Sequence, residues 1–167
     1  MKRILSLVFM IVLLCGCGEK TVTPVTRQIS FTAKITYYNE QFVCDTKVDK
    51  NGVTEMTVKS PDSLKGLCFT VSKDKTVAEF LGLTYTPQTE EMPYFIVTRT
   101  LFELLDTVSG KEGKCEEENC VISGRVGERP FNLTLAPTGL PICAEIPDDS
   151  FTVEFCNMTV KKNKKDK

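Results

Sequence analysis

The strongest constraint on the fold is a strict two-residue alternation that begins after Gln28. Polar residues alternate over this stretch with the apolar or aromatic residues Ile29, Phe31, Ala33, Ile35 and Tyr37. Successive side chains of a β-strand point to opposite faces of the sheet, so this pattern predicts a long strand with one buried face. The alternation returns at residues 42–48 and 54–58, with Asn51-Gly52 between them. Asn-Gly favours the positive φ angles of a tight turn, which predicts a hairpin.

The register of this hairpin follows from its side chains. Pairing Cys44 with Val58 and Thr46 with Met56 also places Lys47 opposite Glu55. Apolar residues then face apolar residues and opposite charges face each other, so we predict this register.

Further strands are predicted at residues 67–71, 76–86, 122–126, 131–135, 142–146 and 151–155. Residues 76–86 are ambiguous by period alone, but their β-branched and aromatic residues, with Gly82 among them, favour a strand over a short helix. In the last two strands the core face is predicted to carry Ile142, Ala144, Ile146, Phe151, Val153 and Phe155. Together with the strands above, the sequence predicts about nine strands in an antiparallel meander.

Residues 94–108 carry the one strong helical period. Apolar residues recur there at steps of three and four, at Tyr94, Val97, Leu101, Leu104, Leu105 and Val108, and Gly110 follows as a terminator. One helix therefore has to cover the apolar face of the sheet, and the predicted fold class is α+β, mainly β.

The N-terminus predicts export and lipidation. Lys2 and Arg3 precede eleven uncharged residues, 4–14, a run too short to span a bilayer. Leu14-Cys15-Gly16-Cys17 resembles a bacterial lipobox, in which Cys17 becomes the lipidated first residue of the mature chain. An ordinary secretory signal cleaved near Gly18, or an uncleaved apolar N-terminus, is the alternative.

The predicted organisation follows from this signal. Residues 1–16 form a lipoprotein signal peptide, 17–27 the lipidated cysteine and a tether, 28–160 the β domain, and 161–167 a basic disordered tail. Two acyl chains of the palmitate type would anchor the protein to the extracytoplasmic side of the cell membrane.

Composition narrows the function classes. The chain has no histidine, which removes Ser-His-Asp and Cys-His catalysis and His-ligated zinc. The acidic pairs Glu90-Glu91 and Asp148-Asp149 lie in predicted turns, where solvated carboxylates are common. A net charge of −1 does not provide the positive charge that nucleic-acid-binding proteins typically carry. We therefore predict a non-enzymatic protein without a cofactor, a metal or a nucleic-acid partner.

Six cysteines remain besides Cys15 and Cys17. Cys115 and Cys120 flank an acidic loop and are predicted to form a disulfide, with free thiols or a metal loop as alternatives. Cys143 and Cys156 share a face on neighbouring strands, so a cross-strand disulfide competes with free thiols there. The alternation places Cys44 on the apolar face and Cys68 on the polar face, which argues against a bond between them and leaves buried free thiols.

A family resemblance is carried by Ser60-Pro61, Leu64-Lys65-Gly66-Leu67, Leu81-Gly82-Leu83, a helix preceded by Pro93, residues 131–135, Pro137 to Pro141, Ile146-Pro147 and residues 152–157. With these motifs the chain resembles the LolA-like superfamily of lipoprotein carriers and related envelope lipoproteins over residues 28–159. The resemblance implies a curved, unclosed antiparallel half-barrel with the helix on its concave face.

The resemblance leaves two functions open. In the first, a hydrophobic or acyl ligand occupies the space between sheet and helix, lined by Phe31, Phe69, Phe95, Leu101, Phe102, Leu105, Phe131, Phe151 and Phe155. In the second, the core is closed and the anchored protein binds an envelope protein, as germination lipoproteins of this type bind a partner enzyme.

Overall fold

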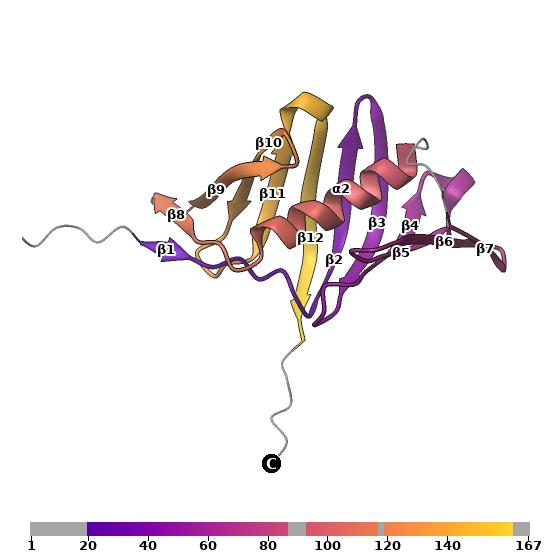
Figure 1. Ribbon diagram of the computed structural model, residues 1–167, viewed down its shortest axis with the longest axis horizontal. Coiled ribbons are helices and arrows are strands. Elements are labelled where there is room, and N and C mark those ends of the chain that lie inside the picture. Colours follow the sequence, from indigo (N-terminus) through magenta and orange to yellow (C-terminus); the bar gives the residue numbers. More distant parts are fainter. Residues whose placement is uncertain (1–19, 87–92, 117–118, 162–167) are drawn as a thin grey trace, which may run out of the picture.

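The computed structural model describes residues 20–86, 93–116 and 119–161, and Figure 1 shows one large antiparallel sheet crossed on one face by a helix. The first seven strands are β1 (Thr21–Val22), β2 (Ile29–Tyr37), β3 (Glu40–Val48), β4 (Thr54–Ser60), β5 (Cys68–Val71), β6 (Thr76–Phe80) and β7 (Leu83–Tyr85). After the helix α2 (Pro93–Val108) come β8 (Gly113–Glu116), β9 (Asn119–Val126), β10 (Arg129–Leu135), β11 (Pro141–Ile146) and β12 (Phe151–Val160). Two short 3-10 helices, η1 (Asp62–Leu64) and η2 (Pro147–Asp149), lie between strands.

The sheet consists of two meanders joined in its middle. The strand order is β1-β8-β9-β10-β11-β12-β2-β3-β4-β5-β6-β7. The last strand, β12, pairs with the first long strand, β2, so that Phe155 lies opposite Ala33. The N- and C-terminal halves of the domain are therefore held together by backbone hydrogen bonds at the centre of the sheet.

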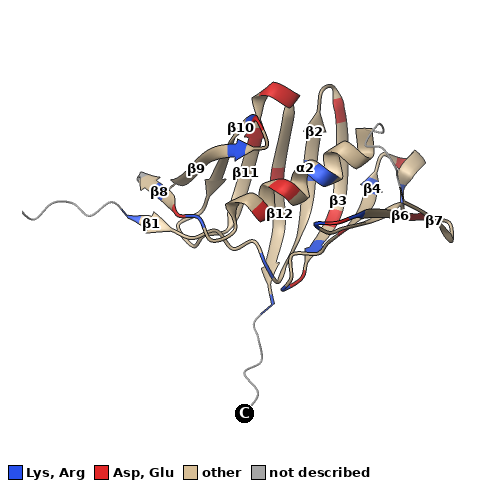
Figure 2. Cartoon of the chain, viewed as in Figure 1, with Lys and Arg blue, Asp and Glu red and all other residues tan. Residues whose placement is uncertain are grey.

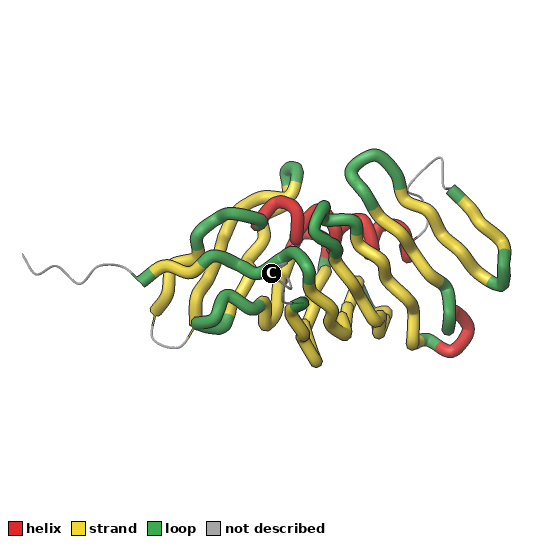
Figure 3. Tube along the Cα trace, turned by 90° about the horizontal axis from the view of Figure 1, so that it is seen from below, coloured by secondary structure: helices red, strands yellow, loops and turns green. Residues whose placement is uncertain are grey.

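Figure 3 shows the sheet curving around the side on which α2 lies. Irregular pairing between β3 and β4, between β10 and β11, and between β12 and β2 interrupts three strand pairs. Such bulges bend a strand and increase its twist. They allow a sheet of this width to wrap around a single helix.

The structure has twelve strands in its sheet rather than about nine. Residues 76–86 form two strands, β6 and β7, because Leu81 and Gly82 both take positive φ and make a two-residue turn. Lys114 and Val121 pair where an acidic loop was predicted, which makes β8. The third extra strand is β1, formed where a tether was predicted: Thr21 and Val22 pair with β8.

The predicted hairpin register is confirmed. Cys44 faces Val58, Thr46 faces Met56 and Lys47 faces Glu55. The carboxylate of Asp49 accepts hydrogen bonds from the backbone N–H groups of Asn51 and Val53, both at 2.8 Å. The loop is thus held by a side chain as well as by the glycine.

The core lies between the concave face and α2. The alternation in β2 is confirmed, since Ile29, Phe31, Ala33 and Ile35 are all buried. One core prediction is wrong: Ile142 is 43% exposed. The pairing of β10 with β11 shifts from Cys143 to Pro141, and Ile142 is left out of the ladder and turned outward.

Candidate functional site

The nine predicted lining residues all lie in one packed core. They come from β2, β5, α2, β10 and β12, and none is more than 9% exposed. The ring centroids of Phe31 and Phe155 are 5.1 Å apart, and those of Phe69 and Phe95 are 5.3 Å apart. A cavity wide enough for an acyl chain would leave its walls open to a water-sized probe. In this structure these side chains fill the space between sheet and helix themselves, and a role in ligand binding stays a hypothesis.

Ion pairs and a hydrogen bond join the outer side of α2 to both halves of the sheet, and Figure 2 shows charges of both signs along the helix. Glu103 meets Arg99 at 3.0 Å and Arg129, from the start of β10, at 3.3 Å. Arg99 also donates to the backbone carbonyl of Ser72 in the β5–β6 turn at 2.7 Å. Further along, Asp106 pairs with Arg27 at 2.5 Å. These contacts hold the helix against the sheet from two directions.

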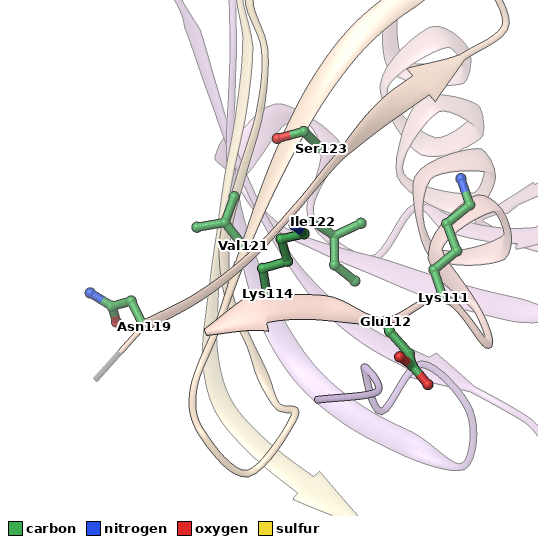
Figure 4. Close-up of a pocket in the computed structure, with 7 residues that line it drawn as sticks. All are labelled: Lys111, Glu112, Lys114, Asn119, Val121, Ile122 and Ser123. Atoms are coloured by element: carbon green, nitrogen blue, oxygen red, sulfur yellow. The ribbon is translucent and has the colours of Figure 1, made fainter. Parts of the chain in front are cut away.

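A cavity of about 770 Å³ opens beyond the C-terminal end of α2, beside the β8–β9 hairpin. Its walls carry Lys111, Glu112, Lys114, Asn119, Val121, Ile122 and Ser123. Figure 4 shows these side chains pointing in different directions rather than toward a common point. The cavity offers apolar wall and amino groups but no convergent set for catalysis. Sequence reasoning missed it because it depends on the β8–β9 hairpin, which was predicted to be a loop.

The β6–β7 hairpin exposes a group of apolar side chains. Leu81 is 87% exposed, Leu83 is 76% exposed and Tyr85 is 54% exposed, while Phe80 beside them is half-buried. We call residues 80–85 the apolar hairpin. Figure 1 shows that β7 is the edge of the sheet farthest from β1. The sequence signal for this feature was present in Leu81-Gly82, but the stretch was interpreted as one strand.

The cysteine predictions have different outcomes. The disulfide between Cys115 and Cys120 is confirmed, and the two residues face each other across β8 and β9. For Cys143 and Cys156, where a disulfide and free thiols were both left open, the structure has free thiols, because Cys143 lies opposite Glu154 and the two cysteines are offset by two residues. Both are free, as are Cys44 and Cys68.

Cys44 gives a prediction about reactivity. Burial, helped by the charge of Asp45, raises the pKa of its thiol from 9.0 to about 12. Only the thiolate is nucleophilic, so at pH 8 the native protein is expected to alkylate at Cys44 roughly a thousandfold more slowly than an ordinary thiol. Peptide mass spectrometry after iodoacetamide treatment measures this. Labelling of Cys44 as fast as the half-buried Cys143 would contradict it.

The raised pKa of the Cys44 thiol also makes the stability of the fold depend on pH. The unfolded thiol ionises near pH 9.0, whereas the folded thiol keeps its proton until about pH 12. The unfolded state therefore binds fewer protons in this window, and the contribution of Cys44 to stability is lost as the pH rises through it.

No group of three or more His, Cys, Asp or Glu side chains is placed to hold a metal ion in residues 20–86, 93–116 and 119–161. Over the same residues, no helix is both long and apolar enough to cross a membrane. Cys17 and the predicted signal peptide lie outside the described residues, as do the tail residues after Lys161 and the pair Glu90-Glu91.

Comparison with known proteins adds little. No protein-family model matches the chain, and no curated protein matches it. Among solved structures, a LolA superfamily protein from Nitrosomonas europaea is similar with a TM-score of 0.38 and 6% sequence identity, over 80% of this chain and 85% of that one. The fold class stands on the topology described above.

Proposed function

We propose that this protein is a lipid-anchored, non-enzymatic binding protein of the cell envelope, which acts by engaging a partner protein with its surface. The observation that supports this choice is the closed core, in which none of the nine predicted lining residues exceeds 9% exposure. The ion pair of Glu103 with Arg129 and the hydrogen bond from Arg99 to the Ser72 carbonyl support it further, because they fix the helix over that core.

Anchoring is tested by fractionation. Cys17→Ser removes the sulfur that would carry the acyl chains, so the protein is expected to move from the membrane fraction to the soluble fraction. Cys15→Ser is the matched control, because Cys15 follows the bulky Leu14 and belongs to the removed segment. Unchanged membrane association of the Cys17→Ser protein would contradict lipidation at this residue.

The binding mode is tested on the purified protein. With a closed core, organic extraction followed by mass spectrometry is expected to recover no stoichiometric lipid, and a fluorescent hydrophobic probe is expected to stay in water. Affinity capture from membranes with a tag after Lys167 is expected to recover one envelope protein in near-equal amount. Stoichiometric acyl lipid in the extract would contradict the proposal.

The alternative function, binding of a hydrophobic or acyl ligand, is favoured by one observation. The cavity at β8–β9 is lined by the aliphatic side chain of Ile122 and by Lys111 with its amino group. This chemistry suits an anionic amphiphile, with the chain on the aliphatic wall and the head group near the cation. If a fatty acid binds, Lys111→Glu is expected to weaken it while Lys34→Glu, on the far face of β2, leaves it unchanged.

A further inference from the structure

We infer that the apolar hairpin inserts into the surface of the membrane to which the chain is anchored, as a second point of contact. Three of the seven large apolar side chains exposed among the described residues belong to it: Leu81, Leu83 and Tyr85. The other four are scattered, and scattered apolar residues are ordinary on a protein surface. A contiguous group is not, and it marks a surface that is covered in function.

The group lies where the helix stops covering the sheet. Phe80 and Leu83 face each other across the hairpin, as do Ala78 and Tyr85. Ala78 is buried, and the ring of Tyr85 lies 6.1 Å from that of Phe95 in the first turn of α2. Beyond this contact the concave face continues outward to the exposed Leu83 and to the turn. The hairpin is thus an uncovered extension of the core surface.

The chemistry of the hairpin suits a bilayer interface. Residues 80–86 carry no charge, and Glu79 at the base faces Cys68 within the sheet. The leucines occupy the tip, whereas Tyr85 lies nearer the domain. Aliphatic side chains favour the acyl region and tyrosine favours the level of the head groups, so this order matches the depth profile of a membrane surface.

The positions of the chain ends favour the membrane as occupant, and this step rests on the proposed lipidation of Cys17. The backbone joins the sheet as early as Lys20, whose carbonyl accepts a hydrogen bond from the N–H of Cys115 at 2.9 Å. Three residues reach at most about 10 Å, so the β1 end is held close to the bilayer. Twelve strands spaced about 4.8 Å apart put the hairpin roughly 50 Å away along the sheet, at the opposite end in Figures 1 and 3.

The charge of the C-terminus supports the same orientation. β12 ends at Val160 near the middle of the sheet order, and five of the seven residues that follow are lysines. A basic segment is attracted to anionic lipid. With contacts at its two ends and a basic segment between them, the domain would lie along the membrane instead of pivoting on one anchor.

The absence of tryptophan from the sequence allows a direct test. In the full lipidated protein, reconstituted into vesicles of phosphatidylethanolamine and phosphatidylglycerol, Leu81→Trp introduces a single reporter at the tip. Its emission is expected to shift to shorter wavelength and to be quenched by brominated lipids. Leu83→Trp repeats the test at a strand position, since Leu81 has a positive φ. Ile142→Trp is the control on β11 and should show neither effect. Reporters at 81 and 83 that stay in water would overturn the inference.

A second measurement separates the hairpin from the anchor and from the tail. The unlipidated Cys17→Ser protein is expected to bind the same vesicles weakly, and combining Leu81→Asp with Leu83→Asp should lower this binding at least about tenfold, because a buried leucine contributes 1.5–3 kcal/mol. Ile142→Asp is the control. If vesicle binding is lost in 1 M salt but is unchanged by the two leucine substitutions, the basic tail acts alone and the inference is overturned. If the same two substitutions abolish capture of the partner protein but leave vesicle binding unchanged, the hairpin belongs to a protein interface and the inference is overturned as well. Neither result depends on Cys17 lipidation, which fractionation tests separately.

Discussion

Replacing Ala33 with phenylalanine is expected to destabilise the domain by about 1–3 kcal/mol or more, with no gain or loss of a bound lipid. Ala33 is fully buried at the centre of the sheet, between Cys44 on β3 and Phe155 on β12. Both neighbours are buried, and the rings of Phe31 and Phe155 already touch. A phenyl group added to a packed core forces side chains off their rotamers and moves the backbone. At this chain length each kcal/mol lowers Tm by about 2–4 °C.

The measurement is thermal unfolding of the unlipidated Cys17→Ser protein, followed by circular dichroism because the chain has no tryptophan. Lys34→Phe is the matched control: it introduces the same side chain on the same strand, but on the exposed face, where only a 3.9 Å ion pair with Glu154 is lost. That control should change stability by less than about 1 kcal/mol. If Ala33→Phe instead leaves Tm unchanged and excludes a hydrophobic probe that the parent protein binds, the space beside Ala33 is a ligand cavity and the closed core is wrong.

The sequence predicted the parts of the fold that rest on alternation and on helical period. Cys44, Val58, Thr46 and Met56 specify their register because a shift by one residue would turn apolar side chains to solvent. The helix was found because its period extends over residues 94–108, nearly the whole of α2. These signals are local in the chain and strong, so no knowledge of the partner strands was needed.

The three missed strands show what local signals leave out. Thr21 and Val22 form a strand by pairing with β8, and β8 in turn pairs with β9, to which the disulfide between Cys115 and Cys120 joins it. Two-residue and four-residue strands carry too few side chains for a period to be visible. The same limit hid the cavity at β8–β9 and the pairing of Thr21 and Val22, which were predicted to belong to a tether.

The candidate site was predicted less well than the fold. Hydrophobicity identified Phe69 and Leu105 as inward-facing, but it does not distinguish a residue that fills a core from one that lines a cavity. Only the packing of sheet against helix decides this. The apolar hairpin was missed for the opposite reason, since Leu83 and Tyr85 alternate like core residues although both are exposed.

Replacing Leu101 with alanine is expected to cost about 2–5 kcal/mol of folding free energy. Leu101 is completely buried in the middle of α2, and α2 is the one α-helix that the described residues place on the concave face. Removing three carbons loses their transfer free energy and leaves a void that the surrounding strands cannot close. Ile96→Ala removes as many carbons from the half-buried side of the same helix, so it should cost clearly less.

The pair of helix variants also bears on how the protein works. If α2 is fixed over a closed core, urea unfolding of Leu101→Ala should remain a single transition with an unchanged m-value, because sheet and helix unfold together. If α2 were instead a lid that opens to admit a ligand, weakening its buried side should detach it before the sheet unfolds, and a lower m-value or a second transition would appear. The ion pair between Glu103 and Arg129 and the hydrogen bond from Arg99 to the Ser72 carbonyl argue for the first outcome, since they join the helix to two separate parts of the sheet and are left intact by this substitution. A single transition would leave the surface as the place where this protein meets its partners.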